Sequence, residues 1–141
     1  HFADLRNHLM PRMDMACSAL LQDLDERGLL DETLVVWLGE FGHTPRINGN
    51  AGRDHWGSHH ATVMIGKNVK AGIVGGLEWK TNEFFAAAFN STDGAINPSG
   101  DVPPLESLGA VGKTIGAAVG LPEATLNTDI KVGKLIKAAL V

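Results

Sequence analysis

The 141-residue chain has no tyrosine, one cysteine and no long hydrophobic run. A lone Cys17 excludes an internal disulfide framework and any zinc site built from several cysteines. No apolar stretch approaches the roughly 20 residues that a membrane-spanning helix needs, so we expect no transmembrane segment. Basic residues are also scarce: 12 Lys and Arg stand against 16 Asp and Glu. The resulting net charge of −4 argues against a nucleic-acid partner, because phosphate binding needs a basic face.

The rest of the composition is that of a globular protein. Hydrophobic residues make up 44% of the chain and the mean hydropathy is +0.01, which argues against disorder. The length is typical of one domain, so we expect residues 1–141 to form one folding unit or part of one. The chain starts at His1 without an initiator Met or signal pattern, and we expect it to be a part of a longer protein.

Two segments carry a helical pattern. Over residues 12–27 the apolar side chains recur every three or four positions, which predicts a helix that buries one stripe, formed by Met13, Cys17, Leu20 and Leu24. Pro11 marks either a kink or the start of this helix, and Gly28 is suited to end it. A second apolar stripe predicts a helix over 105–119, ended by Gly120. A brief helix is also expected over 82–89.

Two short apolar runs predict strands. Residues 33–38 and 62–65 are apolar and partly β-branched, without the alternation of a half-exposed strand. Such runs are typical of strands buried on both faces, as in a parallel sheet. A helix, a glycine turn and a buried strand in this order indicate the α/β class. We expect the two strands to share one sheet, with the helix at 12–27 packed on it.

The long polar loop between these strands is the candidate site. Residues 39–60 hold four of the six histidines of the chain. In α/β sheets, catalytic groups gather beyond the carboxyl ends of strands. Imidazoles and carboxylates bind zinc, manganese or iron, and arginine binds oxyanions. The loop side chains of interest are Glu40, His43, Arg46, Arg53, Asp54, His55, His59 and His60. The alternative is a solvated surface loop, in which Glu40 forms a salt bridge with one of the arginines.

The loop carries a recognisable motif. Gly39-Glu40-Phe41-Gly42-His43-Thr44-Pro45-Arg46-Ile47-Asn48, with Gly52-Arg53-Asp54-His55-Trp56, resembles the bacterial family called Domain of Unknown Function 1501. The preceding helix and strand resemble those before the Asp-His-Gly metal motif of sulfatases and other alkaline-phosphatase-superfamily enzymes. The resemblance covers about residues 5–76 and weakens beyond.

The resemblance implies a fold and a ligand set. The fold is an α/β/α sandwich with a largely parallel sheet, of which residues 1–141 are the C-terminal part, incomplete at the N-terminus. In sulfatase-like relatives the strand ends in two metal ligands, Asp and His; here these positions are Glu40 and Phe41, and only Glu40 can ligate. Beyond what the resemblance implies, we infer that Asp54 and His55 either restore the lost donors or supply the other metal position. We therefore assign Glu40, Asp54 and His55 as ligands of a divalent metal such as zinc, manganese or calcium. Arg53 or Arg46 would stabilise the oxyanion.

The resemblance also implies a function and a location. The expected protein is an exported, periplasmic or secreted, metal-dependent hydrolase of phosphate or sulfate esters, acting on a small molecule or a polysaccharide. Half of its site would come from the N-terminal part of the same protein. The alternative is a non-catalytic binding or structural protein that reuses the sulfatase-like fold, since fold alone does not imply activity.

Overall fold

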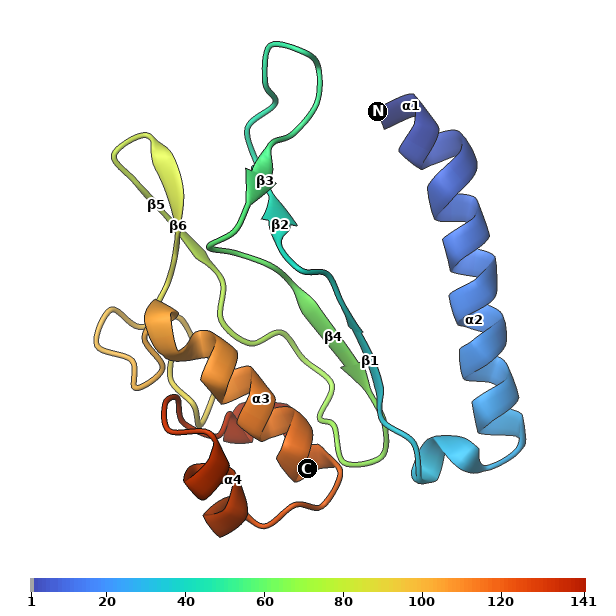
Figure 1. The fold of residues 1–141 in the computed structure, drawn as a ribbon, viewed down its shortest axis with the longest axis vertical. Helices are drawn as coiled ribbons and strands as arrows, with labels where there is room; N and C mark the ends of the chain where they lie inside the picture. The colour runs from blue at the N-terminus through green and yellow to red at the C-terminus, as the bar shows by residue number, and fades with distance from the viewer. Residues whose placement is uncertain (1) are drawn as a thin grey trace. The chain divides into compact units, whose positions relative to one another are not determined.

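The computed structural model describes residues 2–141, which divide into two compact units. His1–Lys67 is called the first unit and Asn68–Val141 the second unit. Each combines helices with short two-stranded ladders (Figure 1). The mixed α/β class expected from the sequence is therefore confirmed.

The first unit begins with one long helical segment. It consists of α1 (Phe2–Asp4), η1 (Leu5–Leu9) and α2 (Met10–Glu26). Within η1 the winding widens to the π type, and the Met10 N–H donates to the carbonyl five residues back, that of Leu5. Pro11 stands in the first turn of α2 and has no N–H to donate to the preceding turn, which accounts for the local widening. Gly28, at φ +68°, ends the helix as expected.

The two predicted strands of this unit do pair. After the short turn η2 (Leu29–Asp31), β1 (Val35–Leu38) forms a ladder with β4 (Thr62–Ile65), from Val35 opposite Ile65 to Leu38 opposite Thr62. The pairing is antiparallel, as it is in every ladder of residues 2–141. A parallel sheet is thus not present in the described part of the chain, although the prediction that these two strands share a sheet is confirmed.

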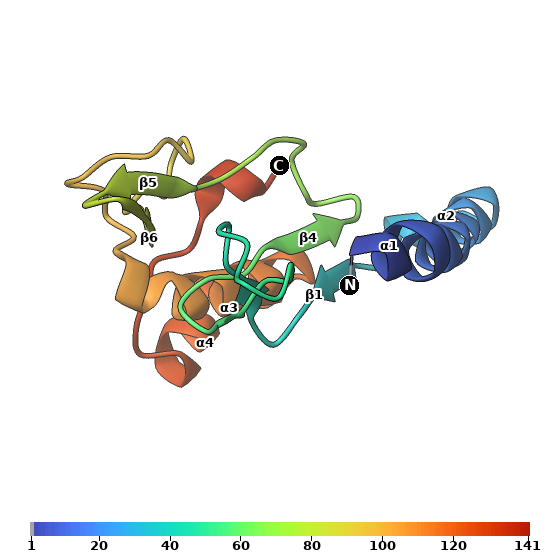
Figure 2. The ribbon, with the colours of Figure 1, turned by 90° about the horizontal axis from the view of Figure 1, so that it is seen from above.

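The prediction that α2 packs on this sheet is wrong for residues 2–141. Leu20, expected in the core, is 51% exposed, and α2 contains no buried residue. The elements that α2 packs against are its chain neighbours η1 and η2. Figure 2 shows the helix running beside the β1–β4 ladder rather than across it. A two-stranded ladder offers too little apolar surface to cover a helix of 17 residues.

The second unit contains the remaining elements. They are β5 (Leu77–Lys80), β6 (Glu83–Ala86), η3 (Pro104–Glu106), α3 (Ser107–Ala118), α4 (Glu123–Asp129) and η4 (Lys137–Ala139). The brief helix expected over 82–89 is wrong, because β6 occupies that stretch. Thr81 and Asn82 both have positive φ, 46° and 66°, and form the two-residue turn of a β-hairpin. The helix expected over 105–119 is confirmed as α3, and Gly120 ends it at φ +88°.

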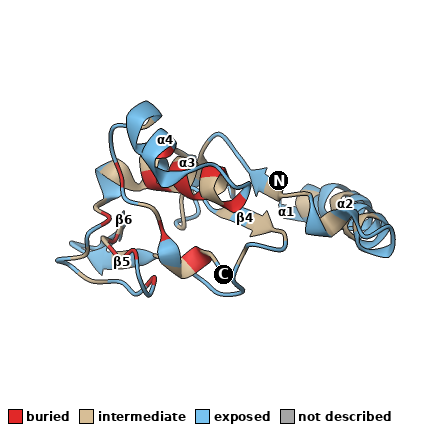
Figure 3. Ribbon diagram, turned by 90° about the horizontal axis from the view of Figure 1, so that it is seen from below, coloured by how far each residue is buried: buried red, intermediate tan, exposed pale blue. Residues whose placement is uncertain are grey.

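Among residues 2–141, every buried residue lies in the second unit. Figure 3 shows them concentrated on α3 and the segments around it. Thr114 is fully buried: its hydroxyl donates to the Ala110 carbonyl at 2.7 Å and accepts the Ile136 N–H at 3.0 Å. Leu126 of α4 lies directly over Gly116, where a Cβ would stand 2.5 Å from Leu126 Cδ2. These contacts join α3, α4 and the C-terminal segment into one core.

No helix within residues 2–141 has both the length and the hydropathy required to cross a bilayer.

Candidate functional site

A small hairpin organises the polar loop of the first unit. β2 (Gly42–His43) pairs with β3 (His55–Trp56), with His43 opposite His55. The pairing continues beyond the strands, because the Thr44 N–H donates to the Asp54 carbonyl at 2.9 Å. Gly42 permits a close approach: its N–H donates to the His59 carbonyl at 2.5 Å, and a Cβ would collide with that oxygen. The glycine of the Glu-Phe-Gly sequence is therefore required by the backbone.

Asn48 holds the tip of the hairpin together. Its side-chain oxygen accepts the N–H groups of Asn50 and Gly52, each at 3.0 Å. Its side-chain amide donates to a carboxylate oxygen of Asp54 at 2.8 Å. An Asx side chain that bonds the backbone two residues on is a common turn device. The Asn-Gly pair at 48–49 was the sequence signal for this organising role, which the sequence reasoning missed.

The two candidate arginines differ in what they contact. Arg53 is half-buried, and its Nη1 donates to the carbonyls of Thr44 at 2.8 Å and Pro45 at 2.6 Å. Its guanidinium carbon also lies 5.9 Å from the centroid of the Phe2 ring, within cation–π range. The Arg46 side chain is exposed. Arg53 thus ties the loop together, whereas Arg46 is accessible to a bound anion.

Aromatic contacts bring two histidines together on the hairpin. The rings of His43 and His55 are nearly perpendicular, with centroids 5.4 Å apart. The Phe41 ring lies 4.2 Å from that of His55. Both histidines are exposed. Phe41 therefore packs against a neighbouring imidazole at the position where the resemblance implies a ligating histidine.

The remaining two histidines of the loop differ from this pair in their surroundings. The His59 ring stacks on Trp56 with centroids 3.7 Å apart, and its Nδ1 is 2.9 Å from the Ser58 hydroxyl. His60 is exposed. Trp56 thus supports one imidazole by stacking, a role that suits packing of the loop.

The proposed metal ligands do not form a complete set within the described chain. Glu40 is exposed in the bend after β1. Asp54 is also exposed, but one of its carboxylate oxygens accepts a hydrogen bond from the Asn48 side chain. Within residues 2–141, no group of three or more His, Cys, Asp and Glu side chains is arranged to hold a metal ion. The ion pairs in this range do not include Glu40, so the salt bridge considered as its alternative is not formed here. The ligand assignment of Glu40, Asp54 and His55 stays a prediction.

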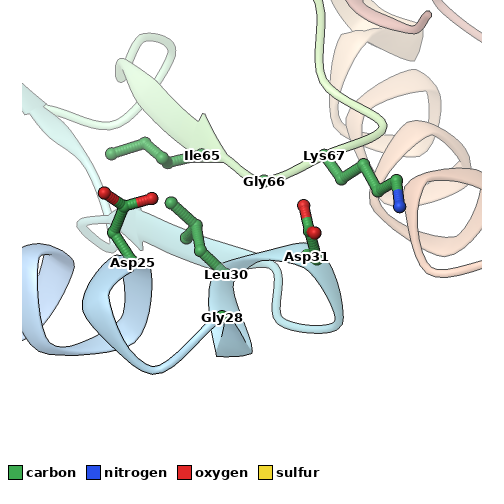
Figure 4. Close-up of a pocket in the computed structure, with 7 residues that line it drawn as sticks. All are labelled: Asp25, Gly28, Leu30, Asp31, Ile65, Gly66 and Lys67. Atoms are coloured by element: carbon green, nitrogen blue, oxygen red, sulfur yellow. The ribbon is translucent and has the colours of Figure 1, made fainter.

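A cavity of the first unit lies elsewhere, at the end of α2. It has a volume of about 310 Å³ and is lined by Asp25, Gly28, Leu30, Asp31, Ile65, Gly66 and Lys67. Figure 4 shows two carboxylates, one lysine and two aliphatic side chains around it. None of the residues assigned from the sequence lines this cavity. It does not alter the assignment of the site to the hairpin.

Comparison with known proteins gives the family. The family model described as "Protein of unknown function (DUF1501)" matches residues 2–88, which is more than half of the chain. The chain belongs to this family. The match covers the first unit and continues through the β5–β6 hairpin. No curated protein and no solved structure matches the chain.

Proposed function

We propose that this DUF1501 chain contributes part of the active site of a metal-dependent hydrolase of phosphate or sulfate esters. The observation that carries the proposal is the β2–β3 hairpin, whose hydrogen-bonded backbone holds His55 and Asp54 next to each other and presents them to solvent after β1. Imidazole and carboxylate groups are ligands for zinc and manganese. Exposed Arg46 supplies a positive charge for an ester oxyanion.

The donors on this chain do not by themselves fit a metal, since they fall short of a group of three in residues 2–141. The proposal therefore requires further ligands from another segment of the same protein. When bound, the metal would supply Lewis-acid polarisation of the ester oxygen. On this chain, Asp54 and His55 with Glu40 would hold the ion, Arg53 would position the loop, and Arg46 would contact the anion.

The sheet is part of the same proposal. In the sulfatase-like sandwich, β1 would form the edge at which parallel strands from the rest of the domain add to the ladder with β4. Support comes from the apolar side chains that this ladder leaves exposed: Trp37 is 46%, Leu38 54% and Val63 45% exposed. Strands with apolar residues on both faces are typical of sheets covered on both sides.

The second candidate is a non-catalytic binding protein that reuses this fold. Two observations favour it. Phe41, which cannot ligate a metal, packs on His55 and stands where the sulfatase-like resemblance would place a ligating histidine. Arg53 is committed to two backbone carbonyls rather than to a substrate. Under this proposal the hairpin is a recognition surface, and metal binding is not accompanied by hydrolysis.

We further propose that the protein is exported to the periplasm or secreted, with a small-molecule or polysaccharide ester as substrate. This follows only from the sulfatase-like resemblance of the loop and the adjoining helix and strand. Fractionation of the cells that produce the protein tests it. A protein found entirely in the cytoplasm would contradict export.

Metal content tests the site assignment. The product of the complete gene is purified with and without His55→Ala, and zinc, manganese and calcium are measured by elemental analysis. We expect His55→Ala to lower the bound metal, because it removes one ligand, and His60→Ala, an exposed histidine of the same loop, to leave it unchanged. Equal metal content in all three proteins contradicts the assignment of His55.

Hydrolysis separates the two candidate functions. The metal-loaded complete protein is assayed with aryl phosphate and aryl sulfate esters. Hydrolysis that is lost in His55→Ala and weakened in Arg46→Gln supports the hydrolase. Bound metal without hydrolysis of either ester supports the binding protein.

A further inference from the structure

The second unit contains a buried lysine, a charged side chain that is unusual in a protein interior. Lys113 lies on the inner face of α3 among Ala110, Thr114 and Gly116, and only 5% of its surface is exposed. Its Nζ donates to the side-chain oxygen of Asn127 at 2.8 Å. Across residues 2–141, no carboxylate lies within ion-pair distance of this ammonium group. Lysine is almost never fully buried without a charged partner, so its positive charge lacks a counter-ion here.

This lysine lines a cavity of about 380 Å³. A cavity of this size lies within the usual range for small-molecule sites. Its wall comes from the loop before η3, from α3 and α4, and from the C-terminal segment. The residues that form it are Ser91, Thr92, Asp101, Lys113, Glu123, Asn127, Gly133, Lys134, Leu135 and Lys137. Three lysines and two carboxylates therefore face one space, which leaves one positive charge in excess.

The carboxylate Asp101 is already engaged by other groups. It accepts the Ser91 N–H at 2.7 Å and the Ser91 hydroxyl at 2.9 Å, and it pairs with Lys134 at 3.2 Å. The Asp101 carboxylate is thus bound to Ser91 and Lys134 and does not pair with Lys113. Glu123 remains as the second acidic group on the wall. Within residues 2–141 neither Lys113 nor Lys137 forms an ion pair, and Glu123 can offset only one of the two charges.

We propose that this cavity binds a small molecule through a phosphate or sulfate group, with Lys113 as the counter-charge of that group. An oxyanion would take up the remaining N–H bonds of the buried ammonium, and charge-assisted bonds of this kind are among the strong ones. Lys137 and the Thr92 hydroxyl on the same wall add donors for the oxyanion, and Leu135 offers apolar contact for the rest of the ligand. The site lies beyond residue 88, where the family match ends, and is independent of the hairpin proposal.

A titration of the whole chain with inorganic phosphate and with sulfate tests the proposal. NMR shifts of the Asn127 side-chain amide and of the residues lining the cavity report binding, with sodium chloride at equal ionic strength as the reference. We expect saturable shifts with phosphate or sulfate. Lys113→Met should weaken this binding about tenfold or more, because one charge-assisted bond is lost. Lys131→Met is the matched control: this exposed lysine of the same unit does not line the cavity, and its loss should leave the affinity unchanged.

The same titration can overturn the proposal. Shifts that chloride reproduces, or equal weakening by Lys113→Met and Lys131→Met, show a general charge effect and contradict a site. If Lys113→Met does not fold, Lys137→Met decides, because Lys137 is exposed and its removal spares the core. Weaker phosphate binding in Lys137→Met supports the proposal, and unchanged binding contradicts it.

Discussion

The two units differ in where their free energy of folding can come from. In the first unit, no residue from 2 to 67 is buried, and large apolar side chains such as Leu9, Met15 and Leu38 are more than half exposed. In the second unit, Val102 and Thr114 are fully enclosed and surrounded by further buried residues. Burial of apolar surface is the dominant favourable term in folding. The second unit therefore has a core of its own, and the first does not.

The candidate site belongs to the unit without a core. Its hairpin is held by hydrogen bonds, among them those of Asn48 and Arg53, and by ring contacts between exposed or half-exposed side chains, without any buried residue. A typical hydrogen bond of this kind contributes only about 0.5–1.5 kcal/mol net. Local hydrogen bonds therefore specify the shape of the hairpin. Its rigidity requires in addition that the exposed apolar side chains of the first unit be covered by further apolar surface.

The largest loss of stability is expected from a substitution that disturbs the close backbone packing of the second unit. Gly133→Ala places a Cβ against the Ala110 nitrogen and 2.6 Å from the Glu106 carbonyl oxygen, at a φ of +78°. Neither backbone group can move without disturbing α3. We expect a loss of about 3–5 kcal/mol in the free energy of unfolding, measured by urea denaturation.

Gly120→Ala is the control for this change. Gly120 also has a positive φ, +88°, but nothing lies within 4 Å of its Cβ position. Only the conformational penalty applies, so we expect a loss of about 1 kcal/mol. Equal losses in the two variants would mean that the close approach of Gly133 to α3 is not present in solution.

The next effect compares one leucine from each unit. Leu126→Ala removes a side chain that is 5% exposed and should cost about 2–5 kcal/mol. Leu20→Ala removes one that is 51% exposed and should cost about 1 kcal/mol, less than its sequence pattern suggested. Both are measured by urea denaturation of the whole chain. A Leu20→Ala loss as large as that of Leu126→Ala would show that α2 is buried.

The smallest effect concerns acid stability. The backbone N–H and hydroxyl of Ser91, aided by Lys134, lower the pKa of Asp101 from 3.8 to about 2. A lowered pKa stabilises the folded state above pH 3.8, and this stabilisation is lost as pH falls toward 2. Asp101→Asn should therefore reduce the pH dependence of stability in that window. The carboxyl ¹³C shift of Asp101 checks the pKa directly, and a midpoint near 4 would contradict it.

Local patterns predicted the two longest helices, α2 and α3, and the two strands β1 and β4. The stripe from Met13 to Leu24 with Gly28 after it predicted α2, and two β-branched runs predicted β1 and β4, because these signals are local. The antiparallel pairing of β1 with β4 was not predictable, since parallel or antiparallel direction depends on which strands of the chain pair with each other. The hairpin over 77–86 was missed because Thr81 and Asn82 are not the usual Asn-Gly pair of such turns.

The sequence predicted which loop forms the candidate site, but not how the side chains of that loop are arranged. Motif and composition indicated residues 39–60, and the hairpin register then placed His43 opposite His55. The role of Arg53 depends on carbonyls eight and nine residues away, which spacing alone does not reveal. Lys113 was overlooked because a single lysine in a helical stripe is usually exposed at its tip.

Amide hydrogen exchange of the whole chain, resolved by residue, tests the contrast between the units most directly. Exchange rates report the free energy of local opening. We expect strong protection for the amides of Val102, Thr114 and Ile136 in the second unit, and exchange faster by orders of magnitude for those of β1 and β4 in the first. Amides of β1 and β4 that exchange as slowly as those of α3 would contradict the claim that the first unit lacks a core of its own.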